Sequence, residues 1–379
     1  MSTILIKNGT LIDGSGSKRY LADILIENEK IKKIGKLDLT ADTVIDASEK
    51  IVSPGFIDTH SHSDLKVLIE PFVEPKIRQG ITTEILGQDG ISMAPLPEEY
   101  VSSWRKNLAG LDGDSDELKW DWKNTDGYLN LISKTGSGPN ELYLVPHGNI
   151  RMEAMGLEAR VATKEELEKM KEITRREMEA GVAGLSTGLI YIPCAYAETE
   201  ELIEICKVAA EYGRPLVIHQ RSEADTMLES MQEVIRIAKE SGVKIHFSHF
   251  KICGQKNWKL IEPVIALLDK CKEEGINVSY DQYPYVAGST MLGVILPPWA
   301  HAGGTDKLIE RLKDKSLREK MKKDIIEGIP GWDNFIDFAG FDGIYVTSVK
   351  TDKNQDCIGK NLTEIAEMRG KEKFDAVFD

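Results

Sequence analysis

Two histidines one residue apart give the strongest chemical signal in this sequence. His60 and His62 stand in the segment 55–64, which follows the apolar run 51–57. Side chains alternate along a β-strand, so both imidazoles would point to the same side. Two imidazoles that converge from one strand end can bind a divalent metal. The alternative is a pair of solvated histidines in a loop, so further ligands must come from the rest of the chain.

Seven apolar runs alternate with charged, helix-like stretches after residue 50. The predicted strands cover residues 51–60, 81–87, 141–147, 181–187, 215–221, 244–251 and 277–285, and the predicted helices include 164–180, 199–212 and 225–242. Successive strands begin mostly about 30 to 35 residues apart, which is the spacing of an α/β protein with a TIM-type (β/α)8 barrel. An open doubly wound sheet has similar spacing, but no strand-linked Gly-x-Gly-x-x-Gly fingerprint favours one.

The two ends of the chain depart from this alternation. Residues 1–53 hold short apolar runs (4–6, 10–12, 23–26 and 31–34) between turn residues, which predicts a small sheet that needs further strands. We expect an inserted small subdomain at 290–350, with a charged helical stretch at 308–327, and a barrel formed by 54–289 and 351–379. The run 344–349 is an alternative eighth strand, but no site residue follows it. One strand is therefore missing, and we expect a chain truncated at its C-terminus.

Barrel active sites lie at the carboxyl ends of the strands, and more histidines fall there. His219 and His249 end the fifth and sixth predicted strands, and His147 ends the third. Period-two alternation places Lys251 on the face of His249, toward the lumen, and His246 on the opposite face, toward the helices. Four of the seven histidines thus make a metal site the favoured interpretation: His60, His62, His219 and His249.

Charge and cysteine usage limit the class of protein. The chain has 379 residues, of which 41% are hydrophobic, and a formal net charge of -14 spread along its length. Nucleic-acid binding needs clustered Lys and Arg, so we expect no nucleic-acid partner, whereas an anionic small substrate remains compatible. Five dispersed cysteines without a Cys-x-x-Cys pair favour a reducing compartment. We find no secretory signal and no apolar stretch of about 18 residues, which predicts a cytoplasmic protein without a membrane span.

The motifs at the strand ends resemble those of one family. They are similar to the D-aminoacylase (N-acyl-D-amino-acid deacylase) branch of the amidohydrolase superfamily. The matching segments are GFIDTHSHSD (55–64), GLSTGLIYIP (184–193), HQR (219–221), SHFK (248–251) and DQYPY (281–285). Their joint occurrence over most of the chain is far more specific than any one of them. The resemblance implies a TIM-type barrel of the metal-dependent hydrolase kind, beside a small β-sandwich built from both chain termini.

The resemblance also implies zinc, as one or two ions. His60 and His62 would form half of one metal site, and His219 and His249 would belong to a second, tighter one. In many relatives a Cys at the end of the second strand completes the tight site, and Asp89 stands at the matching position here. A carboxylate can ligate or bridge zinc but is harder than a thiolate, which leaves the identity of the metal open. The alternative for Asp89 is an ordinary turn residue.

Further positions bear on the substrate. By resemblance, Lys251 and Tyr283 hold the substrate's α-carboxylate, as suits an ammonium and a phenol donor, although either is also compatible with an ordinary strand-end residue. Arg221 shares the face of His219 and either binds substrate or holds a neighbouring carboxylate. Dihydroorotases and hydantoinases carry a carboxylated lysine on the fourth strand, and the segment 184–188 has none. This disfavours a cyclic amidase.

Three functions remain open at this point. The first is zinc-dependent hydrolysis of the amide bond of N-acyl-D-amino acids, with a small-molecule substrate as the partner. The second is another hydrolase of the superfamily, acting on cyclic amides or dipeptides, and the third is an inactive metal-binding fragment. Amide hydrolysis needs a carboxylate that takes a proton from water and passes it to the leaving amine. The resemblance puts this aspartate on the eighth strand, beyond Asp379, so we identify no catalytic residue in the chain, and the oligomeric state is not predicted.

Overall fold

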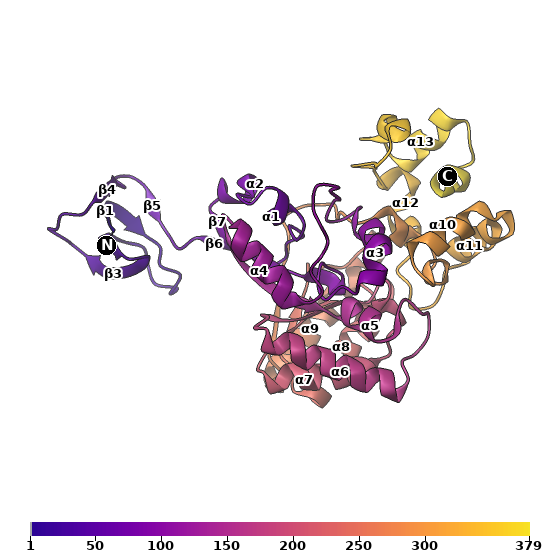
Figure 1. Cartoon of the computed structure of the whole chain (residues 1–379), viewed down its shortest axis with the longest axis horizontal. Coiled ribbons are helices and arrows are strands. Elements are labelled where there is room, and N and C mark those ends of the chain that lie inside the picture. Colours follow the sequence, from indigo (N-terminus) through magenta and orange to yellow (C-terminus); the bar gives the residue numbers. More distant parts are fainter. Residues whose placement is uncertain (1) are drawn as a thin grey trace. The chain divides into compact units, whose positions relative to one another are not determined.

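The computed structural model describes residues 2–379, which divide into two compact units (Figure 1). The first unit comprises Met1–Ile57 with Gln79–Thr82, and the second comprises Asp58–Arg78 with Thr83–Asp379. Every residue that the sequence predicts for the metal and the substrate belongs to the second unit.

The first unit is built around a five-stranded sheet. Its strands are β1 (Thr3–Leu11), β2 (Tyr20–Glu27), β3 (Lys30–Gly35), β4 (Thr43–Asp46) and β5 (Ile51–Val52). The order is β3-β2-β1-β4, with β5 also paired to β1. Asn28 and Glu29 between β2 and β3 both have positive φ, as a tight hairpin turn that matches the strand twist requires. Leu11, Ala22 and Ile24 form the small buried core of this unit.

Two strand boundaries predicted for this region were wrong. The runs 4–6 and 10–12 lie in one strand, β1, whose pairing with β2 shifts register between Ile6 and Gly9. The predicted strand 51–60 is divided, because Ile51–Val52 pair with β1 while a separate strand begins at Phe56. The division falls at Pro54-Gly55, since proline has no amide hydrogen for the ladder and glycine weakens a strand interior.

The second sheet has seven strands that follow one another in chain order from β6 to β12. They are β6 (Phe56–Asp58), β7 (Ile81–Leu86), β8 (Asn140–Pro146), β9 (Gly184–Gly188), β10 (Leu216–His219), β11 (Ile245–Phe247) and β12 (Val278–Tyr280). Neighbouring strands from β7 to β12 are parallel. This is a curled TIM-type barrel sheet with one strand missing, so the predicted fold class is confirmed.

Helices connect the parallel strands. They are α1 (Lys66–Ile69), α2 (Glu74–Ile77), α3 (Val101–Leu108), α4 (Thr125–Thr135), α5 (His147–Met155), α6 (Lys164–Glu179), α7 (Thr199–Glu211), α8 (Met227–Ser241) and α9 (Ile261–Glu273). From α5 to α9 each helix contacts the next, so they form a continuous layer beside the sheet (Figure 1). None of the helices formed by residues 2–379 combines the length and the apolar composition that crossing a bilayer requires.

The last part of the chain is helical and has its own buried cluster. Its helices are α10 (Thr305–Lys313), α11 (Lys315–Glu327), α12 (Phe335–Gly343), α13 (Leu362–Arg369) and α14 (Lys373–Phe378). The predicted single helix 308–327 is broken, because the Asp314 side chain accepts hydrogen bonds from Ser316 N and Leu317 N and so caps α11. The run 344–349 contributes only a bridge between Tyr345 and Asn361. The domain boundaries at 290 and 350 stay a prediction.

Candidate metal centre

His60 and His62 lie in the loop after β6, and Ser61 and Ser63 in the same loop hydrogen-bond to Glu84 on β7. Ser61 Oγ and Ser63 Oγ donate to the same oxygen of Glu84, over 2.9 and 3.2 Å. Glu84 is fully buried on β7, and Lys76 Nζ lies 2.8 Å from its carboxylate. The two serine hydroxyls therefore face Glu84, and the two imidazoles face Asp89.

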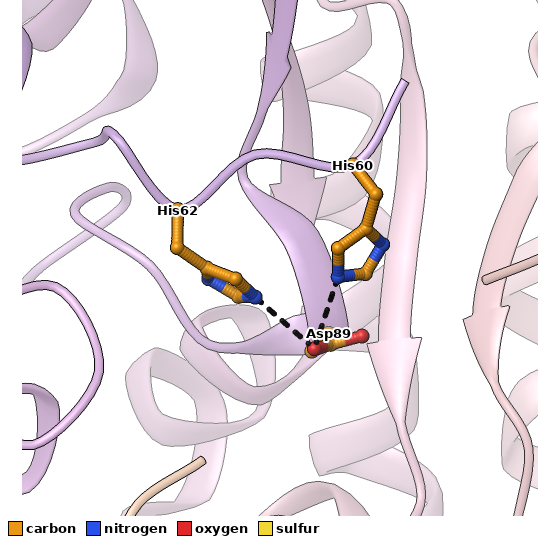
Figure 2. Close-up of side chains that lie close together, drawn as sticks. All are labelled: His60, His62 and Asp89. Atoms are coloured by element: carbon orange, nitrogen blue, oxygen red, sulfur yellow. Dashed lines mark ion pairs between the residues drawn. The ribbon is translucent and has the colours of Figure 1, made fainter. Parts of the chain in front are cut away.

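Asp89 lies where both imidazoles point. Its Oδ2 is 3.5 Å from His60 Nε2 and 3.3 Å from His62 Nε2 (Figure 2). Asp89 sits in the short 3-10 turn Gln88–Gly90 with φ 57° and ψ 19°, a left-handed conformation that aspartate tolerates better than most residues. The carboxylate is buried, with 2% of its side-chain surface exposed. The turn residue therefore presents its side chain to the histidines.

One member of the second histidine pair, His249, faces the other oxygen of Asp89. His219 ends β10, and its Nδ1 is 3.0 Å from His249 Nε2. The same His249 nitrogen is 3.7 Å from Asp89 Oδ1. His249 follows β11 by two residues and has φ 35°, which turns it out of the strand's alternation. Asp89 thus lies between the two pairs.

This arrangement fits metal binding. In each of two groups, His60–His62–Asp89 and Asp89–His219–His249, one ligand atom per residue lies within 4.8 Å of the others. Asp89 Oδ1 is buried and makes no hydrogen bond anywhere in residues 2–379, a costly condition for a carboxylate unless a cation is bound. Imidazole nitrogens and carboxylate oxygens are donors that zinc accepts. The donor set therefore fits one or two divalent ions.

Electrostatics distinguish the members of this cluster. Burial alone would raise the pKa of the Asp89 carboxyl, but His60, together with the nearby His249 and His62, holds it well below its usual range. Burial lowers the pKa of His219 to about 4. Against the same burial, Glu223 and Asp89 raise the pKa of His249 to about 9. An ionised carboxylate thus lies among imidazoles, as a cation site requires.

Two buried acids beside His62 were not among the predicted site residues. Asp112 Oδ1 is 3.4 Å from His62 Nδ1, and Asp64, His62 and Asp112 also bring potential ligand atoms within 4.8 Å of one another. Asp64 Oδ1 accepts hydrogen bonds from Gly87 N, at 2.8 Å, and from Ser92 Oγ. Burial and the nearby Asp112 raise the pKa of Asp64 to about 7. Asp64 ends the 55–64 motif, whereas Asp112 lies in a segment without periodicity and carries no sequence signal.

Lys251 and Tyr283 lie next to the second histidine pair. Lys251 Nζ is 3.0 Å from His249 Nδ1 and 5.5 Å from the centre of the Tyr283 ring. Its closest ion-pair partner is Glu223 Oε2, at 2.6 Å. Glu223 was not among the predicted site residues, although it stands four residues after His219 and two residues after the HQR motif.

Arg221 engages a carboxylate on α8. Its Nη2 lies 2.8 Å from Glu233 Oε1 and donates to the Ala197 carbonyl oxygen at 2.9 Å, and its Nε donates to Glu233 Oε2 at 2.9 Å. These contacts favour the second of the two predicted alternatives, in which Arg221 holds a neighbouring carboxylate.

The predicted face of His246 was wrong. The register Val217↔His246 puts His246 on the same face as Val217 and His219, and His246 Nε2 is 2.8 Å from Asp281 Oδ2. Side-chain alternation does not extend from His246 to His249, because β11 ends at Phe247 and His249 has a positive φ. His147, which the sequence places at the end of the third predicted strand, is fully buried and lies 2.8 Å from Glu201 of α7.

The chain belongs to the amidohydrolase family. A family profile described as "Amidohydrolase family" matches residues 43–272, the stretch that contains the histidine pairs and Asp89.

Individual relatives are more specific. The chain is 36% identical to a D-aminoacylase of Alcaligenes xylosoxydans xylosoxydans over 290 residues, which cover 76% of this chain and 58% of that protein. A zinc- and phosphonate-bound crystal structure of an N-acyl-D-glutamate deacylase from Bordetella bronchiseptica is similar with a TM-score of 0.81 and 30% identity, covering 99% of this chain and 69% of that one. A D-aminoacylase studied for its binuclear metal centre gives a TM-score of 0.78 at 30% identity, with the same coverage of each chain. This chain thus spans little more than half the length of the curated D-aminoacylase.

Proposed function

We propose that this chain carries the metal-binding part of an amidohydrolase that cleaves the amide bond of N-acyl-D-amino acids to a carboxylate and a free D-amino acid. The observation that carries the proposal is the carboxylate of Asp89, which faces His60 and His62 with one oxygen and His249 with the other. The similarity to proteins named D-aminoacylase and N-acyl-D-glutamate deacylase supports the substrate class. A location in the cytoplasm stays a prediction.

Zinc is the proposed metal, as one or two ions. His60, His62 and Asp89 would hold one ion, and Asp89, His219 and His249 the other. A divalent ion in such a site lowers the pKa of bound water and polarises the acyl carbonyl. Asp89 Oδ2 faces His60 and His62, and Oδ1 faces His249. This arrangement supports a role for Asp89 as a ligand shared by both groups. An oxygen donor in place of a thiolate also leaves cobalt and manganese as competitors of zinc.

The substrate's α-carboxylate is proposed to bind at Lys251 and Tyr283. An ammonium and a phenol hydroxyl both donate hydrogen bonds to a carboxylate, and the two side chains lie beside His249 on the side of Glu223. The carboxylate that transfers the water proton stays a prediction for a position beyond Asp379.

The proposal is tested by enantiomer-resolved hydrolysis of N-acetyl-methionine, after reconstitution with Zn²⁺, by the protein with any residues that follow Asp379 included. We expect release of D-methionine from the D-enantiomer only, and loss of that activity on chelation. Hydrolysis of dihydroorotate or a hydantoin instead would support a cyclic amidase, which the absence of lysine from β9 disfavours. Binding of the metal without hydrolysis of any N-acyl-D-amino acid would contradict the activity and leave a metal-binding fragment.

A further inference from the structure

Glu223 is a buried carboxylate that has no role in the function proposed above. It lies in the turn after β10 and is 4% exposed. Its Oε1 is 3.1 Å from His249 Nδ1, and its Oε2 is 2.6 Å from Lys251 Nζ and 4.0 Å from His219 Nε2. One carboxylate thus faces two histidines and a lysine.

Glu223 and Asp89 lie on opposite sides of the two imidazoles. His219 Nδ1 and His249 Nε2 face each other at 3.0 Å, and His249 Nε2 also faces Asp89. The remaining nitrogens, His219 Nε2 and His249 Nδ1, face Glu223. A proton held on the Glu223 side leaves the lone pairs on the Asp89 side, where a metal would bind.

The turn that carries Glu223 is itself held by the helical part of the chain. Asp333, between α11 and α12, accepts hydrogen bonds from Glu223 N at 2.7 Å and from Ser222 Oγ at 2.6 Å. On the other side, the Glu223 carbonyl oxygen accepts from Cys253 N at 2.7 Å. Both the carboxylate and the backbone of Glu223 therefore have defined partners, which limits its movement.

We propose that Glu223 is a positioning residue that sets the tautomers of His219 and His249 and, through the same carboxylate, holds Lys251 beside them. Asp333 supports it from the helical region. The inference deepens the proposed function, on which it depends for the metal and for the role of Lys251. Metal affinity and substrate affinity are then coupled through one side chain: removing its charge disturbs the histidines and also releases Lys251 from its ion pair.

The test is a titration of the metal-free chain with Zn²⁺ against a competing chelator, and with Co²⁺ followed by its visible spectrum. We expect Glu223→Gln to bind Zn²⁺ about 10- to 100-fold more weakly than wild type, the range measured for groups that orient metal ligands, and to change the Co²⁺ spectrum. Asp333→Asn should weaken binding several-fold less than this. Glu240→Gln, which removes an exposed carboxylate paired with Arg236 on α8, is the matched control and should bind as wild type does.

Wild-type affinity and an unchanged Co²⁺ spectrum in folded Glu223→Gln would overturn the inference while leaving the proposed function intact. Should that variant fail to fold, Glu223→Asp is used in its place, because it keeps the negative charge but moves the carboxylate away from the histidines by the length of one methylene. Intermediate affinity supports the inference, and wild-type affinity overturns it. A wild-type chain that binds no metal overturns both the inference and the proposed centre. In an active preparation, Glu223→Gln should also raise KM, which a purely structural role would not do selectively.

Discussion

The two histidine pairs reach Asp89 by different routes. His60 and His62 come from one loop, whereas His219 and His249 come from the ends of two neighbouring strands, β10 and β11. Both members of the first pair face Asp89 Oδ2, and His249 of the second pair faces Oδ1. The half formed by His60 and His62, the loop-borne half, is therefore a local property of the chain. The half formed by His219 and His249, the strand-borne half, exists only when the barrel sheet has formed.

Each half also has a carboxylate behind it, but in a different electrostatic state. Asp112 backs His62, and burial raises its pKa. Glu223 contacts the other pair. Burial alone would raise the pKa of Glu223, but His219, Lys251 and His249 lower it to about 2. A carboxyl whose pKa is lowered stays ionised over a wider pH range, and an ionised acceptor makes the stronger hydrogen bond to an imidazole. We therefore expect the strand-borne half to bind its ion more tightly than the loop-borne half.

The largest effect is expected from removing the residue that the halves share. Asp89→Ala takes one oxygen from each group, so Zn²⁺ affinity should fall more than about 100-fold, beyond the range for residues that only support ligands. Equilibrium dialysis with metal analysis measures this. Asp116→Asn, whose carboxylate is 99% exposed, is the control. Wild-type metal content in Asp89→Ala would show that the two pairs do not depend on a shared carboxylate.

A pair of single variants tests which half is tighter. His219→Asn should weaken binding of the first Zn²⁺ ion by about 100-fold or more, because it removes a donor as well as its orientation. His60→Asn should leave the first ion in place and weaken only the weaker site. Isothermal titration of both metal-free variants gives the order of binding. The reverse order would mean that the local pair, not the strand-borne pair, dominates.

The same comparison explains how much could be predicted from the sequence. The barrel could be predicted from the periodicity of its apolar runs, and the four histidines could be found because each lies at or just beyond a strand end. Glu223 and Asp112 could not be found this way, because they lie in turns and loops where no period fixes the side-chain direction. The face of His246 was predicted from that of His249 by strand alternation. This prediction was wrong because alternation holds only inside a strand, and β11 ends at Phe247, before His249.

A smaller effect on Zn²⁺ affinity is expected from Asp112, the carboxyl that contacts His62. Asp112→Asn keeps the shape of the side chain and replaces a carboxyl whose pKa is already raised by burial. Zn²⁺ affinity should therefore fall less than about 10-fold, the lower limit for orienting groups, and less than in Glu223→Gln. Competition titration of the two variants side by side measures the ratio. A larger loss in Asp112→Asn would reverse the assignment of the stronger support.

A separate effect, on stability rather than on metal affinity, is a pH dependence that belongs to one half only. In the folded, metal-free chain, burial and Asp112 raise the pKa of Asp64 from 3.8 to about 7. Between these values the folded state keeps a proton that the unfolded state has lost, so the free energy of unfolding falls as pH rises from about 4 to about 7. Asp64→Asn cannot titrate. The stability of wild type relative to this variant should therefore decrease through that window, by up to about 4 kcal/mol at about 1.4 kcal/mol per pKa unit.

Urea unfolding of both metal-free proteins across this range measures the difference. Glu223→Gln is the matched variant for the strand-borne half, since the pKa of Glu223 is lowered from 4.5 to about 2. The stability contributed by Glu223 is complete above about pH 4.5 and is lost only as the pH falls toward 2. Wild type relative to Glu223→Gln should thus show a constant difference between about pH 5 and 7. A slope in that comparison, or none in the Asp64 comparison, would mean that the pKa values of Asp64 and Glu223 are not shifted in opposite directions, and the electrostatic contrast between the two halves would lose its support.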